Sequence, residues 1–282
     1  MASFSNFATL SYNGGTVSSN TVTGEILESV TAEKTAVTQE YAAGETVSYA
    51  LSLVNGGSAA VTVSISDDLG AYTFGETTLY PLACRAGTLQ LFVNGVLQPA
   101  PAVTAGPPLV VSGVEIPAGG SAVLVYETEV TAYAPLASAS VITNTATVTG
   151  GGVGVPLTAS ATVGTRDQAA LSISKAVTPA SVPAGGELSY SFEIVNTGNT
   201  AAGADDAAVL SDTFDPVLSG LQVSFNGQSW ARSTNYSYDE TGGVFATLPG
   251  QITVPAATYT QNTDGSWTVE PGSAVLTVSG TI

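Results

Sequence analysis

The chain contains only two lysines, and each can be grouped with an aspartate that follows it and with one asparagine. The two sets are Lys34 with Asp67 and Asn144, and Lys175 with Asp212 and Asn6. Side chains alternate between the two faces of a strand, so residues two apart point the same way. Each of these polar residues then shares a face with aliphatic neighbours, and we expect each set to lie in a core.

Such groups are costly to bury unless they are paired or neutralised. Burial lowers the pKa of a lysine, so that a neutral amine can act as a nucleophile, and it raises the pKa of an aspartic acid, so that the protonated acid can polarise a carboxamide. A lysine, an asparagine and an assisting aspartate could therefore form an isopeptide bond with loss of ammonia. The alternative is a buried lysine–aspartate ion pair capped by the asparagine.

These residues occupy matching positions in an internal repeat. Lys34 is followed by Gly44, Tyr49 and Asn55, and Lys175 is followed at the same offsets of 10, 15 and 21 by Gly185, Tyr190 and Asn196. The copies continue through the segments that contain Asp67 and Asp212, then LQLFVNG (89–95) and LQVSFNG (221–227), then 117–130 and 270–282. The repeat predicts two domains of one design.

The first copy continues into VITNTATVTGGG (141–152) and a returning strand, LTASATV (157–163), which have no counterpart at the end of the second copy. The matching sequence lies near the N-terminus, in FSNFATLSYNGG (4–15) and SNTVTGEI (19–26). Asn6 aligns with Asn144, Ala8 with Ala146, and Leu10 with Val148. Asn13-Gly14 is a strong signal for a two-residue turn, so this segment is expected to be a β-hairpin arm.

Composition favours an all-β protein, because short runs of alternating polar and apolar residues are separated by Gly, Pro and Asn-Gly. A net charge of −17 leaves little to hold phosphates or an anionic membrane, so nucleic acid and membrane insertion are not expected. With no histidine and a single cysteine, the chain lacks a Cys/His zinc site and the usual base of hydrolytic triads. We expect no cofactor and no enzyme activity beyond autocatalytic isopeptide formation, and the sequence pattern predicts neither a signal peptide nor a membrane anchor.

Both copies resemble a bacterial surface repeat known as the domain of unknown function eleven. Both copies have a tyrosine-containing strand ending in Val-Asn-x-Gly and a Ser-Asp strand end, and the first copy adds a Lys-Thr-Ala start and a closing Ile-Thr-Asn-Thr-Ala-Thr-Val. This resemblance implies immunoglobulin-like β-sandwiches on a cell surface without enzyme activity. The lysine and asparagine also resemble the first-strand lysine and last-strand asparagine of collagen-adhesin B-type pilin domains, which mostly use glutamate as the acid.

The predicted organisation is an N-terminal donor-strand arm (1–27), an immunoglobulin-like domain (28–168), and a second such domain (169–282) that lacks its last strands. A sandwich without its last strand exposes a sheet edge that another strand can fill. The connector from about Ile26 to Lys34 spans at most roughly 30 Å, so we do not expect the chain's own arm to be the donor. The arm, through Phe4, Asn6, Ala8 and Leu10, is therefore expected to complete the second domain of a neighbouring copy.

A contact of this kind does not close on itself, so the sequence predicts a head-to-tail homopolymer, a pilus-like fibre on a bacterial cell or spore surface. Asp67 would assist a bond between Lys34 and Asn144 within a chain, and Asp212 one between Lys175 and Asn6 of the neighbour. The alternatives are a surface adhesin for a glycan or host ligand and a spacer fragment of a larger cell-wall protein. Trp230, Tyr236, Tyr238 and Trp267 could form a sugar-binding face, and Cys84 is expected in a loop.

Overall fold

The computed structural model describes residues 2–26, 30–104 and 106–282. These residues are almost entirely strands and turns, so the predicted all-β fold class is confirmed, and their helical structure is one short 3-10 turn. They separate into two compact units. Domain 1 takes the described residues up to Pro135 with Ser140–Thr165 and Thr263–Ser266, and domain 2 takes Leu136–Ala139, Arg166–Asn262 and Trp267–Ile282. No helix in the described ranges is both long and apolar enough to cross a membrane.

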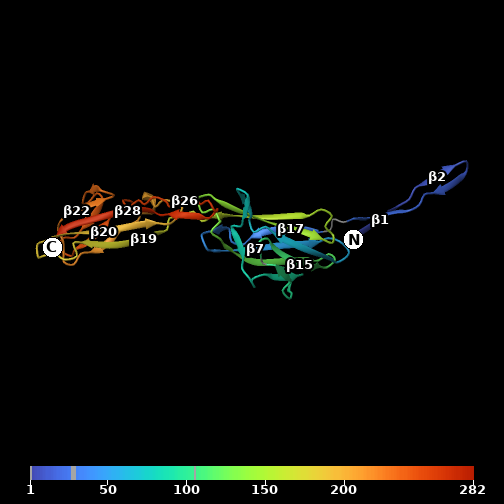
Figure 1. Ribbon diagram of the computed structural model, residues 1–282, viewed down its shortest axis with the longest axis horizontal. Helices are drawn as coiled ribbons and strands as arrows, with labels where there is room; N and C mark the ends of the chain where they lie inside the picture. Colours follow the sequence, from blue (N-terminus) through green and yellow to red (C-terminus); the bar gives the residue numbers. More distant parts are fainter. Residues whose placement is uncertain (1, 27–29, 105) are drawn as a thin grey trace. The chain divides into compact units, whose positions relative to one another are not determined.

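Domain 1 is a β-sandwich of two six-stranded sheets (Figure 1). One sheet has the order β13-β12-β16-β7-β5 with β11 also on β16, and the other has the order β14-β15-β8-β17-β18-β6. Its strands are β5 (Val30–Ala36), β6 (Glu40–Tyr41), β7 (Thr46–Asn55), β8 (Val61–Asp67), β9 (Tyr72–Phe74), β10 (Thr77–Leu79), β11 (Leu82–Cys84), β12 (Gln90–Val93), β13 (Val96–Leu97), β14 (Ala102–Thr104), β15 (Leu109–Ile116), β16 (Ser121–Val130), β17 (Val141–Gly150) and β18 (Leu157–Thr165).

Alternation along the long strands builds the core of domain 1. In β7 and β16, buried side chains alternate with partly exposed ones, as a strand with one face on a core requires. Leu51, Leu53 and Leu124 are at most 1% exposed. Burying each side chain of this kind contributes roughly 1.5–3 kcal/mol, so these strands supply much of the stability of the domain.

Domain 2 repeats the first sheet of domain 1, with β19, β20 and β28 side by side (Figure 1). This sheet has the order β19-β20-β28-β22-β23, and a second sheet has the order β21-β25-β24. The elements are β19 (Leu171–Thr178), β20 (Glu187–Asn196), the 3-10 turn (Ala204–Asp206), β21 (Ser211–Thr213), β22 (Ser219–Phe225), β23 (Gln228–Trp230), β24 (Tyr236–Tyr238), β25 (Val244–Thr247), β26 (Thr258–Gln261), β27 (Trp267–Glu270) and β28 (Gly272–Thr281). Phe214, Phe245 and Leu276 are among its most deeply buried residues.

Several local details are the same in the two domains. Asn55 and Asn196 are fully buried at the ends of β7 and β20. Each side-chain oxygen accepts a hydrogen bond at 2.9 Å from the backbone N–H two residues later, of Gly57 or Gly198. The Asn-Gly pairs at 94–95 and 226–227 both adopt positive φ, which the tight turns of the β12-β13 and β22-β23 hairpins require.

The domains differ at one edge of the second sheet. In domain 1, β8 pairs with β15 on one side and with β17 on the other, and β18 follows β17. In domain 2, β21 takes the place of β8 and pairs with β25. Among the described strands, β21 has no partner on its second side. The sheet of domain 2 therefore stops where β17 and β18 continue the sheet of domain 1.

The arm forms the predicted hairpin, in which β1 (Ala2–Asn6) pairs with β4 (Val22–Ile26) and β2 (Thr9–Tyr12) pairs with β3 (Gly15–Ser18). Asn13 and Gly14 turn the chain with φ of 42° and 81°. Every side chain from Phe4 to Thr23 is exposed, including Phe4 at 56% and Leu10 at 64%. A two-stranded hairpin of this kind is marginally stable without a surface to pack on.

Candidate functional site

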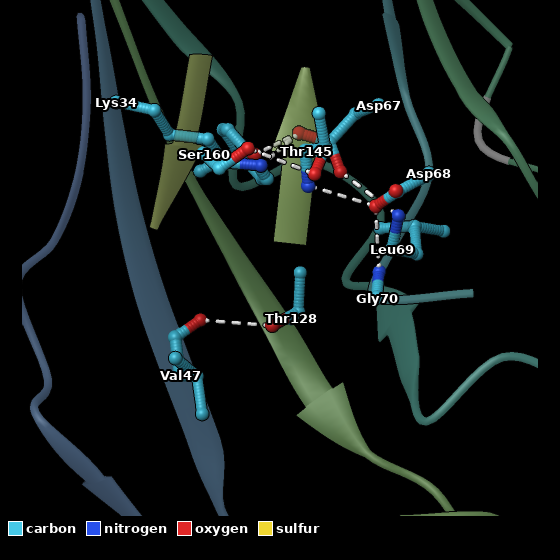
Figure 2. Close-up of polar contacts among 10 residues, drawn as sticks. Lys34, Val47, Asp67, Asp68, Leu69, Gly70, Thr128, Thr145 and Ser160 are labelled. Atoms are coloured by element: carbon cyan, nitrogen blue, oxygen red, sulfur yellow. Dashed lines mark hydrogen bonds and ion pairs between the residues drawn. The ribbon is translucent and has the colours of Figure 1, made fainter. Parts of the chain in front are cut away.

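Domain 1 brings two of the predicted residues into direct contact inside its core. Lys34 lies on β5 and Asp67 on β8, and the Lys34 side chain reaches toward Asp67 (Figure 2). Lys34 Nζ donates to Asp67 Oδ2 at 2.6 Å, and the side chains are 0% and 2% exposed. The ammonium group also lies 5.0 Å from the centre of the Tyr49 ring. A charged pair so fully removed from water is retained only with close partners.

The neighbouring backbone fixes the position of Asp67. Its second oxygen accepts a hydrogen bond from the Leu69 amide at 3.1 Å. The next residue, Asp68, accepts from the amides of Gly70 and Thr145, at 2.9 Å and 2.8 Å, and so joins the end of β8 to β17 (Figure 2). Asp67 is therefore held at the junction of the two strands.

The third predicted residue, Asn144, lies on β17, on the face of the strand that points into the core. Ala146 is the β-ladder partner of Asp67, and Asn144 is two residues before it, on the same face of the strand. Asn144 is 0% exposed, and neither its amide nitrogen nor its amide oxygen has a hydrogen-bond partner among the described residues. The hydroxyl of Tyr49 is also buried without a partner there. A buried polar group left unpaired costs about 1–3 kcal/mol of folding stability, so the buried amide of Asn144 destabilises the domain, which a functional role would explain.

Tyr126 is a further member of the cluster that sequence reasoning missed. Its hydroxyl donates a short hydrogen bond to Asp67 Oδ2, the atom that also accepts from Lys34. The pattern of β16 indicates that Tyr126 faces the core, but it does not indicate how far the ring reaches across to the other sheet. Burial raises the pKa of the Tyr126 and Tyr49 hydroxyls, and the nearby Asn144 side chain opposes part of that rise.

Burial controls the ionisation of these groups. It lowers the pKa of the Lys34 ammonium despite the opposing attraction of Asp67, because the charged form loses its water. It also raises the pKa of Tyr49 and of Tyr126, so both hydroxyls stay protonated and can donate. A lysine whose pKa is lowered, a carboxyl group with donors around it and a buried carboxamide are the groups that a lysine–asparagine isopeptide bond would use.

Domain 2 contains the corresponding pair in a different environment. Lys175 on β19 donates to Asp212 on β21, but the Lys175 and Asp212 side chains are 41% and 19% exposed. The expectation that Lys175 lies buried in a core is therefore wrong for the single chain. The reason is that every residue of β19 is exposed, because no described strand covers it beside β21 as β17 and β18 do in domain 1.

Aromatic rings surround the amine of Lys175. Its Nζ lies 4.4 Å from the centre of Tyr190, 5.4 Å from that of Phe192 and 5.6 Å from that of Phe214. Tyr126 of domain 1 has no equivalent here, because Val278 occupies its position in the β20-β28 ladder. Among the described residues, Asp212 thus has one side-chain donor, Lys175, where Asp67 has two.

The aromatic residues suggested as a sugar-binding face do not form one. Tyr236 and Tyr238 are 5% and 6% exposed and belong to the core of domain 2. Trp230 stacks on Phe225 with ring centres 4.9 Å apart, and the indole nitrogen of Trp267 is buried. These rings pack against the protein instead of presenting open faces.

Cys84 is not in a loop as expected, because it is the last residue of the short strand β11. Its thiol is partly buried, and burial raises its pKa. A raised pKa makes the reactive thiolate scarce at neutral pH, which does not favour a reactive role.

No protein-family model matches the chain, and no curated protein matches it. The resemblance to the domain of unknown function eleven stays an expectation. Solved structures do match. The collagen-binding subdomain of the Enterococcus faecalis surface protein ACE is 9% identical, with 47% of this chain and 95% of that one covered and a TM-score of 0.32.

Two pilins match over more of the chain. BcpA, the major pilin subunit of Bacillus cereus, is 13% identical, with 96% of this chain and 73% of that one covered and a TM-score of 0.35. The pilus backbone RrgB of Streptococcus pneumoniae is 12% identical, covers 86% of this chain, and has a TM-score of 0.35. This chain spans 55% of the length of RrgB. At these TM-scores the likenesses carry no argument about function.

Proposed function

We propose that this chain is a structural subunit of an extracellular fibre, in which the arm of one copy completes domain 2 of the next. One observation carries the proposal: among the described strands, the second sheet of domain 2 ends at β21, where that of domain 1 continues from β8 into β17, β18 and the short β6. The arm supplies a hairpin whose sequence matches β17 and β18, with its apolar side chains exposed. Insertion would bury these side chains and satisfy the free backbone groups of β21.

The contact joins different surfaces of identical chains, so each added copy leaves a new open edge at one end and a new arm at the other. Assembly of this kind gives an open filament rather than a closed ring. The bacterial cell or spore surface is the proposed location. This role needs no cofactor, and its partner is a second copy of the same chain.

We also propose that isopeptide bonds lock the fibre. In domain 1 the neutral Lys34 Nζ attacks Cγ of Asn144, a C–N bond forms, and the bond from Cγ to Nδ2 breaks. Nδ2 leaves as ammonia with the proton that Nζ loses, and Asp67 carries that proton between them. The unpaired, buried amide of Asn144 supports this step, because the product keeps fewer polar atoms to satisfy. In domain 2 the same reaction would join Lys175, assisted by Asp212, to Asn6 of the neighbouring copy.

Removal of the arm tests the fibre. A chain lacking residues 1–24 should give no filaments in negative-stain images, whereas the full chain should give long ones. Circular dichroism should show the same strand content per residue in both, because the arm packs on neither core in the single chain. Filaments of unchanged form from the shortened chain would contradict the proposal, and so would a full chain that stays monomeric at high concentration.

A further inference from the structure

Domain 2 has an apolar pocket beside the open edge of β21. The pocket has a volume of about 180 Å³ and is formed mainly by β19, by β20 and by the segment that leads into β21. Its apolar lining includes Leu171, Ile173, Ile194, Val209, Leu210 and Ile252. Leu171, Ile173 and Val209 are 44%, 58% and 51% exposed. A dry apolar cavity of roughly 150 Å³ already accepts a ring such as benzene, so this pocket has room for one large side chain.

Domain 1 indicates which residue fills the corresponding place. There, Val148 of β17 lies opposite Ile65 of β8 and is 0% exposed. Ile65 is two residues before Asp67, just as Leu210 is two residues before Asp212. The arm residue aligned with Val148 is Leu10, so Leu10 of an inserted arm would lie opposite Leu210, at the pocket.

The same register positions the reactive residues. In domain 1, Ala146 lies opposite Asp67, and Asn144 is the next residue on that face. If Leu10 enters the pocket, Ala8 lies opposite Asp212 and Asn6 is the next residue on the same face. A slip of one residue would turn Asn6 to the other face, and a slip of two would move it by roughly 7 Å.

We propose that this pocket is the receptor for Leu10 of a second copy's arm, and that its occupation sets the register in which Asn6 meets Lys175. The inference rests on the proposed function, and it adds the residue that fixes how the arm of one copy aligns with β21 of the next. Three features support it: the pocket borders the open edge, Leu10 is 64% exposed on the free arm, and the equivalent residue of domain 1 is fully buried. The occupant is thus a leucine on a strand added to β21.

A matched pair of full-length variants tests the donor side. Leu10→Asp places a charge in the pocket, whereas Ser11→Asp places it on the opposite face of the same strand. The concentration needed for filaments, measured by sedimentation, should rise at least about a hundred-fold for L10D and by less than about three-fold for S11D. Leu10 is exposed in the free chain, so neither change is expected to unfold it.

The acceptor side offers an independent pair, Ile173→Asp in the pocket and Ser174→Asp beside it, and I173D should show the larger loss. Leu10→Ala, which leaves the pocket partly empty, should assemble with a lower yield of detergent-resistant multimers. If L10D and I173D assemble as well as their controls, the pocket is not the receptor. Deletion of residues 1–24 distinguishes failure of the pocket proposal from failure of the proposed function. If L10D and I173D assemble normally but the deletion still abolishes filaments, only the pocket proposal is wrong.

Discussion

At the scale of residues, the same pair of side chains occurs in two environments. The Lys34 side chain is 0% exposed and that of Lys175 is 41% exposed, although each contacts an aspartate at the matching position. The difference comes from β17 and β18, which continue the second sheet of domain 1 and have no counterpart among the described strands of domain 2. An amine becomes reactive when it loses water, so the domain 2 pair would become reactive only when an arm covers it.

The domain 1 bond can be tested by intact mass. In a Lys175→Ala background, where no bond between chains can form, the folded protein should be about 17 Da lighter than its sequence, the mass of one ammonia. Adding Asn144→Ala or Asp67→Ala should restore the full mass of the variant sequence and lower the melting temperature. Thr143→Ala, on the exposed face of β17, is the matched control and should keep the loss. A folded K175A protein of unmodified mass would mean that Lys34 and Asp67 form only a buried ion pair.

At the scale of elements, the sequence predicts the long strands and the arm hairpin well, because alternation and Asn-Gly turns are local signals. It also predicts the Lys34–Asp67 contact, since the alternation of side chains along each strand places both residues on core faces. Short strands such as β11 are not predicted, because pairing with β16 decides them. The role of Tyr126 and the exposure of Lys175 depend on which side chains and strands the facing sheet provides. The alternation of side chains along one strand does not reveal this.

The turn of the arm gives a prediction at this scale. Gly14 has a φ of 81°, a conformation that costs a side-chain-bearing residue about 1–2 kcal/mol. Gly14→Val should therefore reduce the population of the hairpin and slow filament growth by roughly 5–30-fold. Thr16→Val, on the neighbouring strand with ordinary geometry, is the control and should grow at the normal rate in light-scattering assays. Equal growth of the two variants would show that a preformed hairpin is not needed for insertion.

At the scale of the whole molecule, the N-terminal arm matches in sequence the strands that the second domain lacks among its described residues. The repeat predicts that relation, because the sequence of the arm matches β17 and the returning strand β18 of domain 1. The sheet order of domain 2 supports it independently, because β21 keeps one strand partner among the described residues where β8 has two. These two observations support the proposal that the sheet of domain 2 is continued by the arm of another copy in a row of identical chains.

The central claim is that the arm of one copy is joined to domain 2 of another, and isotope-mixed filaments test it most directly. Equal amounts of ¹⁴N and ¹⁵N subunits are assembled together, boiled in detergent and reductant, digested, and analysed for branched peptides by mass spectrometry. A branched peptide linking Asn6 to Lys175 is expected, and about half of it should combine one ¹⁴N-labelled and one ¹⁵N-labelled branch. K175A filaments should give none. Filaments that yield no such peptide, or yield it only with both branches carrying the same isotope, would contradict a bond between different copies.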